Sequence, residues 1–207
     1  MAFNLVEHPL AKHFVGRLRD KTTGPAEFRA IAQKLAVILA VEATRQLRTT
    51  RTEVHTPMAV ADAEQIDVGI TAVPILRAGL GMLQPIIELL PDVTVGYIGL
   101  ERDESTSIAS SYYCKLPNLH GRAVFLIDPM LATGGSASQA IDILKSRSAD
   151  SIVLLAVVAA SEGVDRLAKD HPDVAIYATA LDTQLDANKF IIPGLGDFGD
   201  RLFGTES

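Results

Sequence analysis

One stretch in the second half of the chain joins an apolar run, an acid, a glycine-rich turn and a helical pattern. Residues 124–127 are Val-Phe-Leu-Ile, Asp128 follows, and the turn ends in Gly134 and Gly135 before a helical pattern at 137–145. The apolar run is typical of a buried strand, which would bring Asp128 to the carboxyl edge of a sheet. A buried strand that passes through a tight turn into a helix is the building unit of α/β folds.

Strand-like and helix-like segments alternate along most of the chain. We expect strands at residues 68–76, 93–100, 123–128, 152–160 and 174–179. We expect helices at residues 9–19, 25–47, 80–90, 137–145 and 162–169. This alternation predicts an α/β fold with a parallel, twisted sheet flanked by helices, and functional loops should cluster where the strands end. Residues 103–111 are polar and serine-rich, and we expect them to form a mobile loop or hairpin.

The turn at residues 132–136 has the chemistry of a phosphate site. It would present backbone N–H groups and the hydroxyls of Thr133 and Ser136 at the start of a helix. Such a helix start favours an anion because its amides lack partners and its dipole is positive there. The carboxylate of Asp128 would repel a phosphate, so we expect it to contact sugar hydroxyls instead. The combination predicts a site for a phosphorylated ribose.

Two other nucleotide-binding motifs are excluded. A Walker loop needs a lysine before its final Ser or Thr, and residues 129–136 contain none. Residues 194–199 match the pattern Gly-x-Gly-x-x-Gly. The residues after them, 200–207, are too few for the helix, strand and ribose-binding acid of a dinucleotide fold.

Composition limits the remaining classes. The chain has 207 residues, 48% of them hydrophobic, which suits one domain spanning residues 1–207 with a sizeable core. The formal net charge is −6 and basic residues form no run, which argues against nucleic acid as a partner. The longest apolar stretch, residues 152–160, is shorter than the roughly 20 residues that a membrane-spanning helix needs. We therefore expect no membrane association.

The single cysteine, Cys114, excludes an internal disulfide and fits a reducing compartment. The first residues lack the lysine-led apolar run of a signal peptide. Both features predict a cytoplasmic protein. The five histidines show no paired metal spacing, and we expect them to be surface or ordinary core residues. We expect Asp182 and Asp186 to be acids of surface turns.

Three segments resemble one enzyme family. The turn after Asp128-Pro129 is similar to the PRPP-binding loop of phosphoribosyltransferases, where PRPP is phosphoribosyl pyrophosphate. One acid of the usual pair is missing here, as in the uracil branch. Residues 73–81 (Val-Pro-Ile-Leu-Arg-Ala-Gly-Leu-Gly) and 191–197 (Ile-Ile-Pro-Gly-Leu-Gly-Asp) look like further motifs of uracil phosphoribosyltransferases. The resemblance covers nearly the whole chain, and the motifs stand in the family's order.

The resemblance implies an activity and its partners. Uracil would replace pyrophosphate on PRPP to give UMP in pyrimidine salvage. Mg²⁺ would be bound through PRPP rather than mainly by the protein. GTP is a candidate activator, and a homodimer or homotetramer is expected. N-terminal helices at about residues 9–48, a hood over the active site and a uracil-binding segment at about residues 187–204 complete the expected fold.

The resemblance also implies site residues. PRPP would be bound by Arg77, Arg102, Asp128, Pro129, Met130, Leu131, Ala132, Thr133, Gly134, Gly135, Ser136 and Asp197. Uracil would lie against Ile191, Gly196, Asp197 and Phe198. Asp128, Arg77 and Asp197 would act in catalysis by positioning and by stabilising charge. Phe198 stands where a small alanine is common, so an inward-pointing ring would obstruct the base.

Two other functions remain open. A regulator with this fold could sense PRPP or a nucleotide and bind RNA, but it would need a basic surface, and the acidic balance argues against it. A purine phosphoribosyltransferase is closer in chemistry, although residues 191–197 do not favour it. A comparison of uracil, cytosine, guanine and hypoxanthine as substrates would separate these functions.

Overall fold

The computed structural model describes residues 3–102 and 109–205, with no description of the side chains of residues 101, 102 and 109–111. The helices are α1 (Pro9–Arg19), α2 (Pro25–Thr44), α3 (Leu80–Leu89), α4 (Gly135–Ser146), α5 (Ser161–Asp170) and α6 (Phe198–Phe203). The strands are β1 (Phe3–Leu5), β2 (Thr49–His55), β3 (Val60–Ile66), β4 (Gly69–Leu76), β5 (Thr94–Val95), β6 (Tyr97–Arg102), β7 (Ala109–Lys115), β8 (Arg122–Ile127), β9 (Met130–Leu131), β10 (Ser151–Ala160), β11 (Ala175–Asp182), β12 (Gln184–Leu185) and β13 (Ile191–Ile192).

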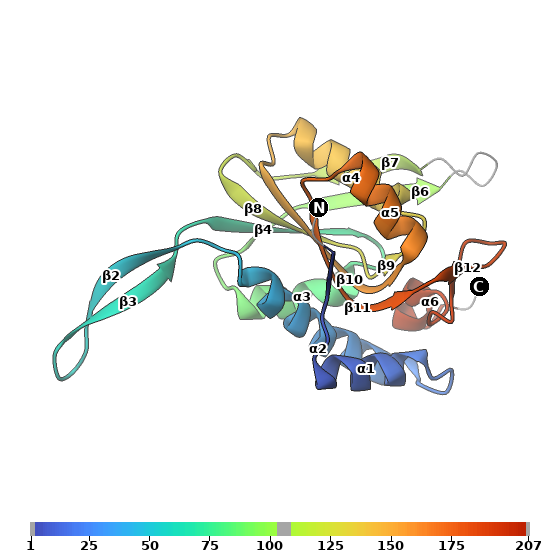
Figure 1. The fold of residues 1–207 in the computed structure, drawn as a ribbon, viewed down its shortest axis with the longest axis horizontal. Helices are drawn as coiled ribbons and strands as arrows, with labels where there is room; N and C mark the ends of the chain where they lie inside the picture. Colours follow the sequence, from blue (N-terminus) through green and yellow to red (C-terminus); the bar gives the residue numbers. More distant parts are fainter. Residues whose placement is uncertain (1–2, 103–108, 206–207) are drawn as a thin grey trace.

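The central sheet is mostly parallel. Its strands follow the order β1-β11-β10-β8-β4-β6-β7, with β5 paired to β4 and β9 paired to β10. Only the pair β6 and β7 is antiparallel among the described pairs of this sheet. Helices α4 and α5 cover one face, and α1, α2 and α3 cover the other (Figure 1). The predicted parallel sheet flanked by helices is confirmed.

Alternating side chains of the central strands supply both hydrophobic cores. In β8, Val124 and Leu126 point to the core beneath α4, whereas Phe125 and Ile127 point to the core beneath α2. All four are fully buried. Parallel strands covered on both faces are apolar at every position, which explains why this strand stands out in the sequence.

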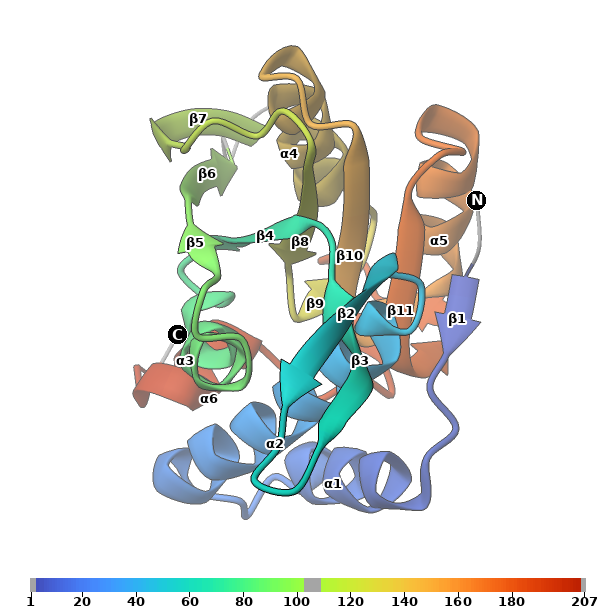
Figure 2. The ribbon, with the colours of Figure 1, turned by 90° about the vertical axis from the view of Figure 1, so that its left-hand side faces the viewer.

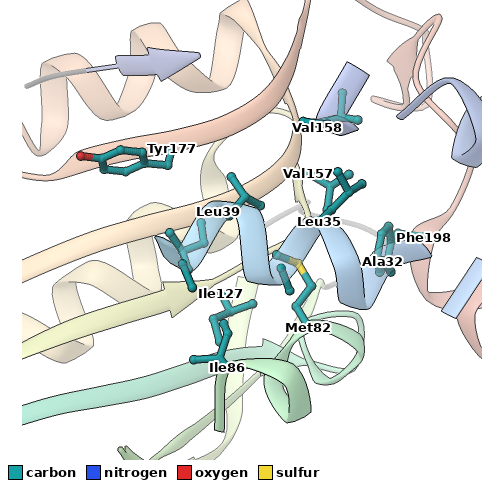
Figure 3. Close-up of a cluster of buried hydrophobic side chains, with 14 of the residues drawn as sticks. Ala32, Leu35, Leu39, Met82, Ile86, Ile127, Val157, Val158, Tyr177 and Phe198 are labelled. Atoms are coloured by element: carbon teal, nitrogen blue, oxygen red, sulfur yellow. The ribbon is translucent and has the colours of Figure 1, made fainter. Parts of the chain in front are cut away.

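Helix α2 forms the centre of the larger core. Its Ala32, Leu35 and Leu39 are fully buried and lie beside Met82 of α3 and the inward face of the sheet (Figure 3). These contacts stabilise α2, because most of a helix's stability in a protein comes from its tertiary packing.

A bulge in β10 keeps the chain after Asp128 attached to the sheet. The N–H groups of Val157 and Val158 both donate to the carbonyl oxygen of Pro129, at 3.0 and 3.1 Å. Two consecutive side chains therefore face the same core. Beyond the bulge, Val158 and Ala159 pair with β9. The bulge thus lets the chain that leaves β8 pair with β10 again as β9. This places the glycine-rich turn at the carboxyl edge of the sheet.

The hairpin of β2 and β3 projects from the body of the protein as an arm (Figures 1 and 2). Both strands are largely exposed. The arm carries four apolar side chains with 42–93% of their surface exposed, namely Val54, Met58, Val60 and Ile66. Neither strand was predicted, because no face of the hairpin is buried and its sequence therefore lacks an apolar alternation.

The other differences between expectation and structure are local. The helix expected at residues 25–47 ends at Thr44. The strand expected at residues 93–100 is split at Gly96 into β5 and β6. Residues 103–111 were expected to form a mobile loop or hairpin. Residues 109–111 belong to β7, which pairs antiparallel with β6, whereas residues 103–108 lie outside the described residues, so the mobility stays a prediction. Strands β1, β9, β12 and β13 and helix α6 were not predicted, and each has at most six residues.

Candidate active site

A cavity of about 230 Å³ lies at the carboxyl ends of β4 and β8. These strands are neighbours in the sheet, with Pro74 opposite Ile127. Arg77 therefore follows one strand and Asp128 the other at the same edge. The lining consists of Ile75, Leu76, Arg77, Ala78, Leu100, Asp128, Met130, Leu131, Ala132, Gly134, Gly135, Ser136 and Ala137. Pro129 and Thr133 belong to the same turn but do not line this cavity.

The glycine-rich turn leads directly into α4. Gly134 is the N-cap residue and has φ +76°, a conformation that favours glycine. As a glycine the N-cap residue has no side chain to cap the helix, but Oγ1 of Thr133 accepts from the N–H of Gly135 at 3.4 Å. The first-turn N–H groups of a helix have no partner within the helix, and here Gly135, Ser136 and Ala137 of that turn line the cavity. The turn and the helix start expected at these residues are therefore present, and anion binding there stays a prediction.

Helix α5 packs closely behind this turn. A Cβ atom on Gly163 of α5 would lie 2.5 Å from the carbonyl oxygen of Ala132. A Cβ atom on Gly134 would lie 3.1 Å from the carbonyl oxygen of Gly163. Two glycines at the contact let the helix and the turn approach backbone to backbone. The turn is thus held by α5 as well as by its own helix.

Arg77 extends from the loop after β4, and the Leu76–Arg77 peptide bond is cis. The loop packs tightly on β8, because a Cβ atom on Gly79 would lie 2.6 Å from the carbonyl oxygen of Ile127. The Arg77 side chain is 61% exposed, and its Nη2 lies 3.6 Å from Oδ1 of Asp200. An exposed ion pair of this length is weak. The guanidinium can therefore turn to an anionic ligand.

Asp128 is half-buried at the end of β8. Its N–H donates to the carbonyl oxygen of Leu155 at 3.1 Å, and its Oδ1 accepts from the N–H of Met130 at 3.4 Å. These bonds fix the carboxylate at the cavity. Arg102 ends β6 at the same edge of the sheet, but its side chain lies outside the description, so its predicted contact with PRPP stays a prediction.

A second cavity, of about 290 Å³, adjoins the first. Met130 and Ala132 line both. The rest of the second lining is Asn188, Lys189, Phe190, Ile191, Gly196, Asp197 and Phe198. Four of these residues, Ile191, Gly196, Asp197 and Phe198, were predicted to bind the base.

Residues 188–190 lie within the uracil-binding segment expected at about residues 187–204, but they were not predicted as individual base contacts. They form a turn in which Oδ1 of Asp186 accepts from the N–H groups of Asn188 and Phe190, at 2.9 and 2.8 Å. Asp186 is therefore a turn acid, as expected. The sequence signal for this turn was Asp186, because an aspartate side chain often closes a turn onto the backbone two residues further on. The turn ends at Phe190, directly before Ile191.

Asp197 and Phe198 were both predicted to contact uracil, but their side chains have different surroundings in the structure. The Asp197 carboxylate accepts from the N–H of Asp200 at 2.8 Å and caps α6. It lines the second cavity rather than the first. The Phe198 ring is 2% exposed and packs against the ring of Phe28 in the larger core. Figure 3 shows it among the core side chains.

The prediction that Asp182 is a surface acid was wrong. Its side chain is 7% exposed and pairs with the guanidinium of Arg19 through two hydrogen bonds of 2.8 and 2.9 Å. The error has a physical reason: the acid ends β11, and its partner comes from α1, which is distant in sequence.

A second arginine, Arg201, lies beside Leu195. Burial lowers the pKa of the Arg201 guanidinium, and the nearby Asp20 acts in the opposite direction.

The side chains and helices of the described residues bear on metal binding and on membrane insertion. Within residues 3–102 and 109–205, no three His, Cys, Asp or Glu side chains gather as a protein-held metal site would require. None of the helices in the described part of the chain is long and apolar enough to span a membrane.

The fold is shared with phosphoribosyltransferases. A solved hypoxanthine-guanine phosphoribosyltransferase from Bacillus anthracis superposes with a TM-score of 0.54 at 13% identity, covering 76% of this chain and 80% of that one. The mostly parallel sheet with helices on both faces, shared with that enzyme, places the chain in the phosphoribosyltransferase fold class.

Sequence relatives narrow the class. A uracil phosphoribosyltransferase from Thermus thermophilus is 47% identical over 208 residues and covers 100% of both chains. One from Agathobacter rectalis is 47% identical over 98% of both. A solved protein from Aquifex aeolicus has a TM-score of 0.94 at 34% identity over 99% of both chains. The family model described as uracil phosphoribosyltransferase matches residues 5–205. The chain belongs to the uracil phosphoribosyltransferase family.

Proposed function

We propose that the two adjoining cavities are the substrate sites for the reaction of this family. In that reaction, N1 of uracil replaces pyrophosphate at the anomeric carbon of PRPP, giving UMP and recovering the base for nucleotide synthesis. The observation that carries the proposal is the shared wall. Met130 and Ala132 line both cavities, so a phosphoribosyl group in the first and a base in the second would meet at this wall.

The first cavity suits the phosphoribosyl group. The 5′-phosphate would lie against residues 132–136, where the first-turn residues of α4 line the cavity. The Asp128 carboxylate would accept hydrogen bonds from the ribose hydroxyls. When pyrophosphate leaves, positive charge develops on the ribose ring, and the carboxylate would stabilise that charge.

The leaving group would be bound by cations. Arg77, with its exposed guanidinium at the mouth of the cavity, suits two phosphate oxygens at once. Arg102 would contribute a second positive charge from the end of β6. Both charges would offset the negative charge that builds on the departing pyrophosphate.

The residues at this site fit the magnesium ion that phosphoribosyltransferases generally use with PRPP. Among the described residues, Asp128 is the acid that lines the first cavity. A single carboxylate suits Mg²⁺ that keeps several waters and is bound mainly by substrate oxygens. Bound in this way, the ion would neutralise charge on the pyrophosphate.

The second cavity suits uracil. Backbone groups of Ile191 and of residues 196–198 would read the edge of the base, which presents an N–H donor between two carbonyl acceptors. Cytosine presents the opposite pattern at two of these positions. Because backbone groups cannot exchange donor for acceptor, the wrong base would leave buried groups unpaired, and sites of this kind discriminate by about 10⁴–10⁵.

Base-dependent release of pyrophosphate from PRPP tests the proposal. We expect turnover with uracil and 5-fluorouracil, which share the same edge, and negligible turnover with cytosine, guanine or hypoxanthine. Efficient use of cytosine would refute recognition by backbone groups. Turnover of a purine instead of uracil would refute the assignment of the base.

We also propose a homodimer or homotetramer. The arm of β2 and β3 exposes Val54, Met58 and Ile66, and an isolated two-stranded hairpin is marginally stable in water. A second copy of the chain would cover it. Sedimentation of the wild type and of Met58→Asp tests this assembly, with a monomeric wild type as the contradicting result. GTP is proposed as an activator, and activity assays with and without GTP test this. A cytoplasmic location is also proposed, and the exposed thiol of Cys114 is consistent with it.

A further inference from the structure

We propose that the buried ion pair of Arg19 and Asp182 is a positioning element for base recognition, which holds the base-binding segment from outside the cavity. Neither side chain lines either substrate cavity. Both bind the backbone of Gly194, which lies between the proposed uracil contacts at Ile191 and Gly196. The inference rests on the proposed function of the second cavity.

The contacts to Gly194 use both of its backbone polar groups. Its N–H donates to Oδ2 of Asp182 at 2.9 Å, and its carbonyl oxygen accepts from Nη1 of Arg19 at 3.2 Å. The same two side chains pair with each other at 2.8 and 2.9 Å. The side chains are 25% and 7% exposed. Bidentate, largely buried pairs of this kind have a fixed geometry.

The turn at Gly194 is too tight to move independently of Ile191. A Cβ atom on Gly194 would lie 2.0 Å from the carbonyl oxygen of Ile191, and Gly194 has φ +51°. The chain thus folds back on itself at this residue. Fixing Gly194 therefore fixes Ile191 on one side and Gly196 on the other.

A second arginine ties the next residue to the same helix. Nη1 of Arg201 donates to the carbonyl oxygen of Leu195 at 2.8 Å and also to that of Leu18, while its Nη2 donates to the carbonyl oxygen of Asp20 at 2.7 Å. Two consecutive residues of the base-binding segment are thereby joined to the C-terminal end of α1. This gives α1, which lies outside the central sheet, a place in base recognition.

The expected effect is selective for the base. A misplacement of about 1 Å in a substrate-positioning element can lower activity by roughly 100-fold. The phosphate turn is held by α4, α5 and β10, whereas Arg19 bonds to Asp182 of β11 and to Gly194. Weakening the pair should therefore raise the KM for uracil and leave the KM for PRPP unchanged.

Arg19→Lys and Asp182→Asn test the inference, made separately so that the result does not depend on one variant folding. Lysine keeps the charge but loses the planar fork, and asparagine keeps the shape but loses the charge. Arg17→Ala is the matched control, because Arg17 lies on the same helix and pairs with Glu27 at the surface. We expect the uracil KM to rise roughly 10- to 100-fold in both variants, with wild-type values in the control.

Hydrogen exchange without substrates gives a second readout. Amides of residues 191–199 should exchange faster in Arg19→Lys than in wild type and in Arg17→Ala. Equal rises in both KM values, or unchanged uracil KM and unchanged exchange, would overturn the inference. If the wild-type protein does not use uracil, the proposed function fails, and exchange alone decides whether the pair holds the segment.

Discussion

The rings of Phe28 and Phe198 meet edge to face, with their centroids 5.0 Å apart and their planes at 69°. Phe28 belongs to α2 and is fully buried, and Phe198 begins α6 beside the second cavity. The pair therefore joins the proposed uracil-binding segment to the core. The large residue at position 198 directs its ring into the protein interior, where it leaves the base cavity open.

This pair gives the first prediction. Phe198→Ala should lower the free energy of unfolding by about 3–5 kcal/mol, because a large buried side chain is lost and a cavity remains. It should not improve the use of uracil. Urea denaturation and steady-state kinetics measure the two effects. Phe203→Ala, a half-exposed ring of the same helix, is the comparison for stability only, because its ring lies 5.8 Å from the Arg77 guanidinium. A variant of wild-type stability with a lower uracil KM would show that the ring obstructs the base.

The second prediction concerns Arg77. Loss of a charge-assisted contact costs about 1.5–3 kcal/mol, so Arg77→Ala should lower kcat/KM for PRPP by roughly 10- to 150-fold. Stability should change little, because the side chain is 61% exposed and its ion pair with Asp200 is long. Arg147→Ala, at the exposed end of α4, is the control. Wild-type kinetics in Arg77→Ala would remove Arg77 from pyrophosphate binding.

The third prediction concerns the turn before α4. Gly134→Ala places a side chain at φ +76° and 3.1 Å from the carbonyl oxygen of Gly163. It should destabilise the protein by about 1–2 kcal/mol and raise the KM for PRPP. Gly16→Ala, in an open position on α1, should instead stabilise it by about 0.5–1 kcal/mol. If both substitutions behave alike, the turn does not require glycine.

The fourth prediction uses a buried hydrogen bond behind the phosphate turn. Ser138 Oγ lies 2.8 Å from Nε2 of His171, whose Nδ1 lies 3.4 Å from Nζ of Lys145. An ammonium group can only donate, so we assign the proton of His171 to Nε2, which then donates to Ser138. Ser138→Ala would leave this N–H unpaired.

The expected loss of stability in Ser138→Ala is about 1–3 kcal/mol. Because Ser138 lies in the first turn of α4, the KM for PRPP should rise as well. Ser146→Ala at the exposed end of the same helix should change stability by less than about 0.5 kcal/mol. Equal stabilities of the two variants would contradict the assigned hydrogen bond.

The sequence predicted the parts of the fold that are buried on both sides. Strands β8 and β10 are apolar at nearly every position because helices cover both faces, and the turn at Gly134 is recognisable because only glycine suits its backbone. The β2 and β3 arm has no buried face, so its sequence carries no period. Helix α6 has six residues and is defined by the Asp197 cap rather than by an apolar stripe.

The residues in and around the candidate site also differ in how well the sequence could predict their positions. Arg77 and Asp128 follow apolar strands directly, so their place at the sheet edge could be predicted. Asp182 could not, because its burial depends on Arg19, 163 residues away in sequence. The direction of the Phe198 ring likewise depends on Phe28, a partner in another helix. Contacts between distant segments leave no local pattern.

The backbone contact between Gly163 and Ala132 has a consequence for ligand affinity. Helix α5 holds the phosphate turn in shape before any anion arrives, so the turn loses its conformational entropy during folding and not again at each binding event. Free phosphate or ribose 5-phosphate should then bind by docking onto a preformed surface, with little change in the amide exchange of residues 132–136. Gly163→Ala, which would push the helix from the turn, should weaken binding by making the anion order the turn itself.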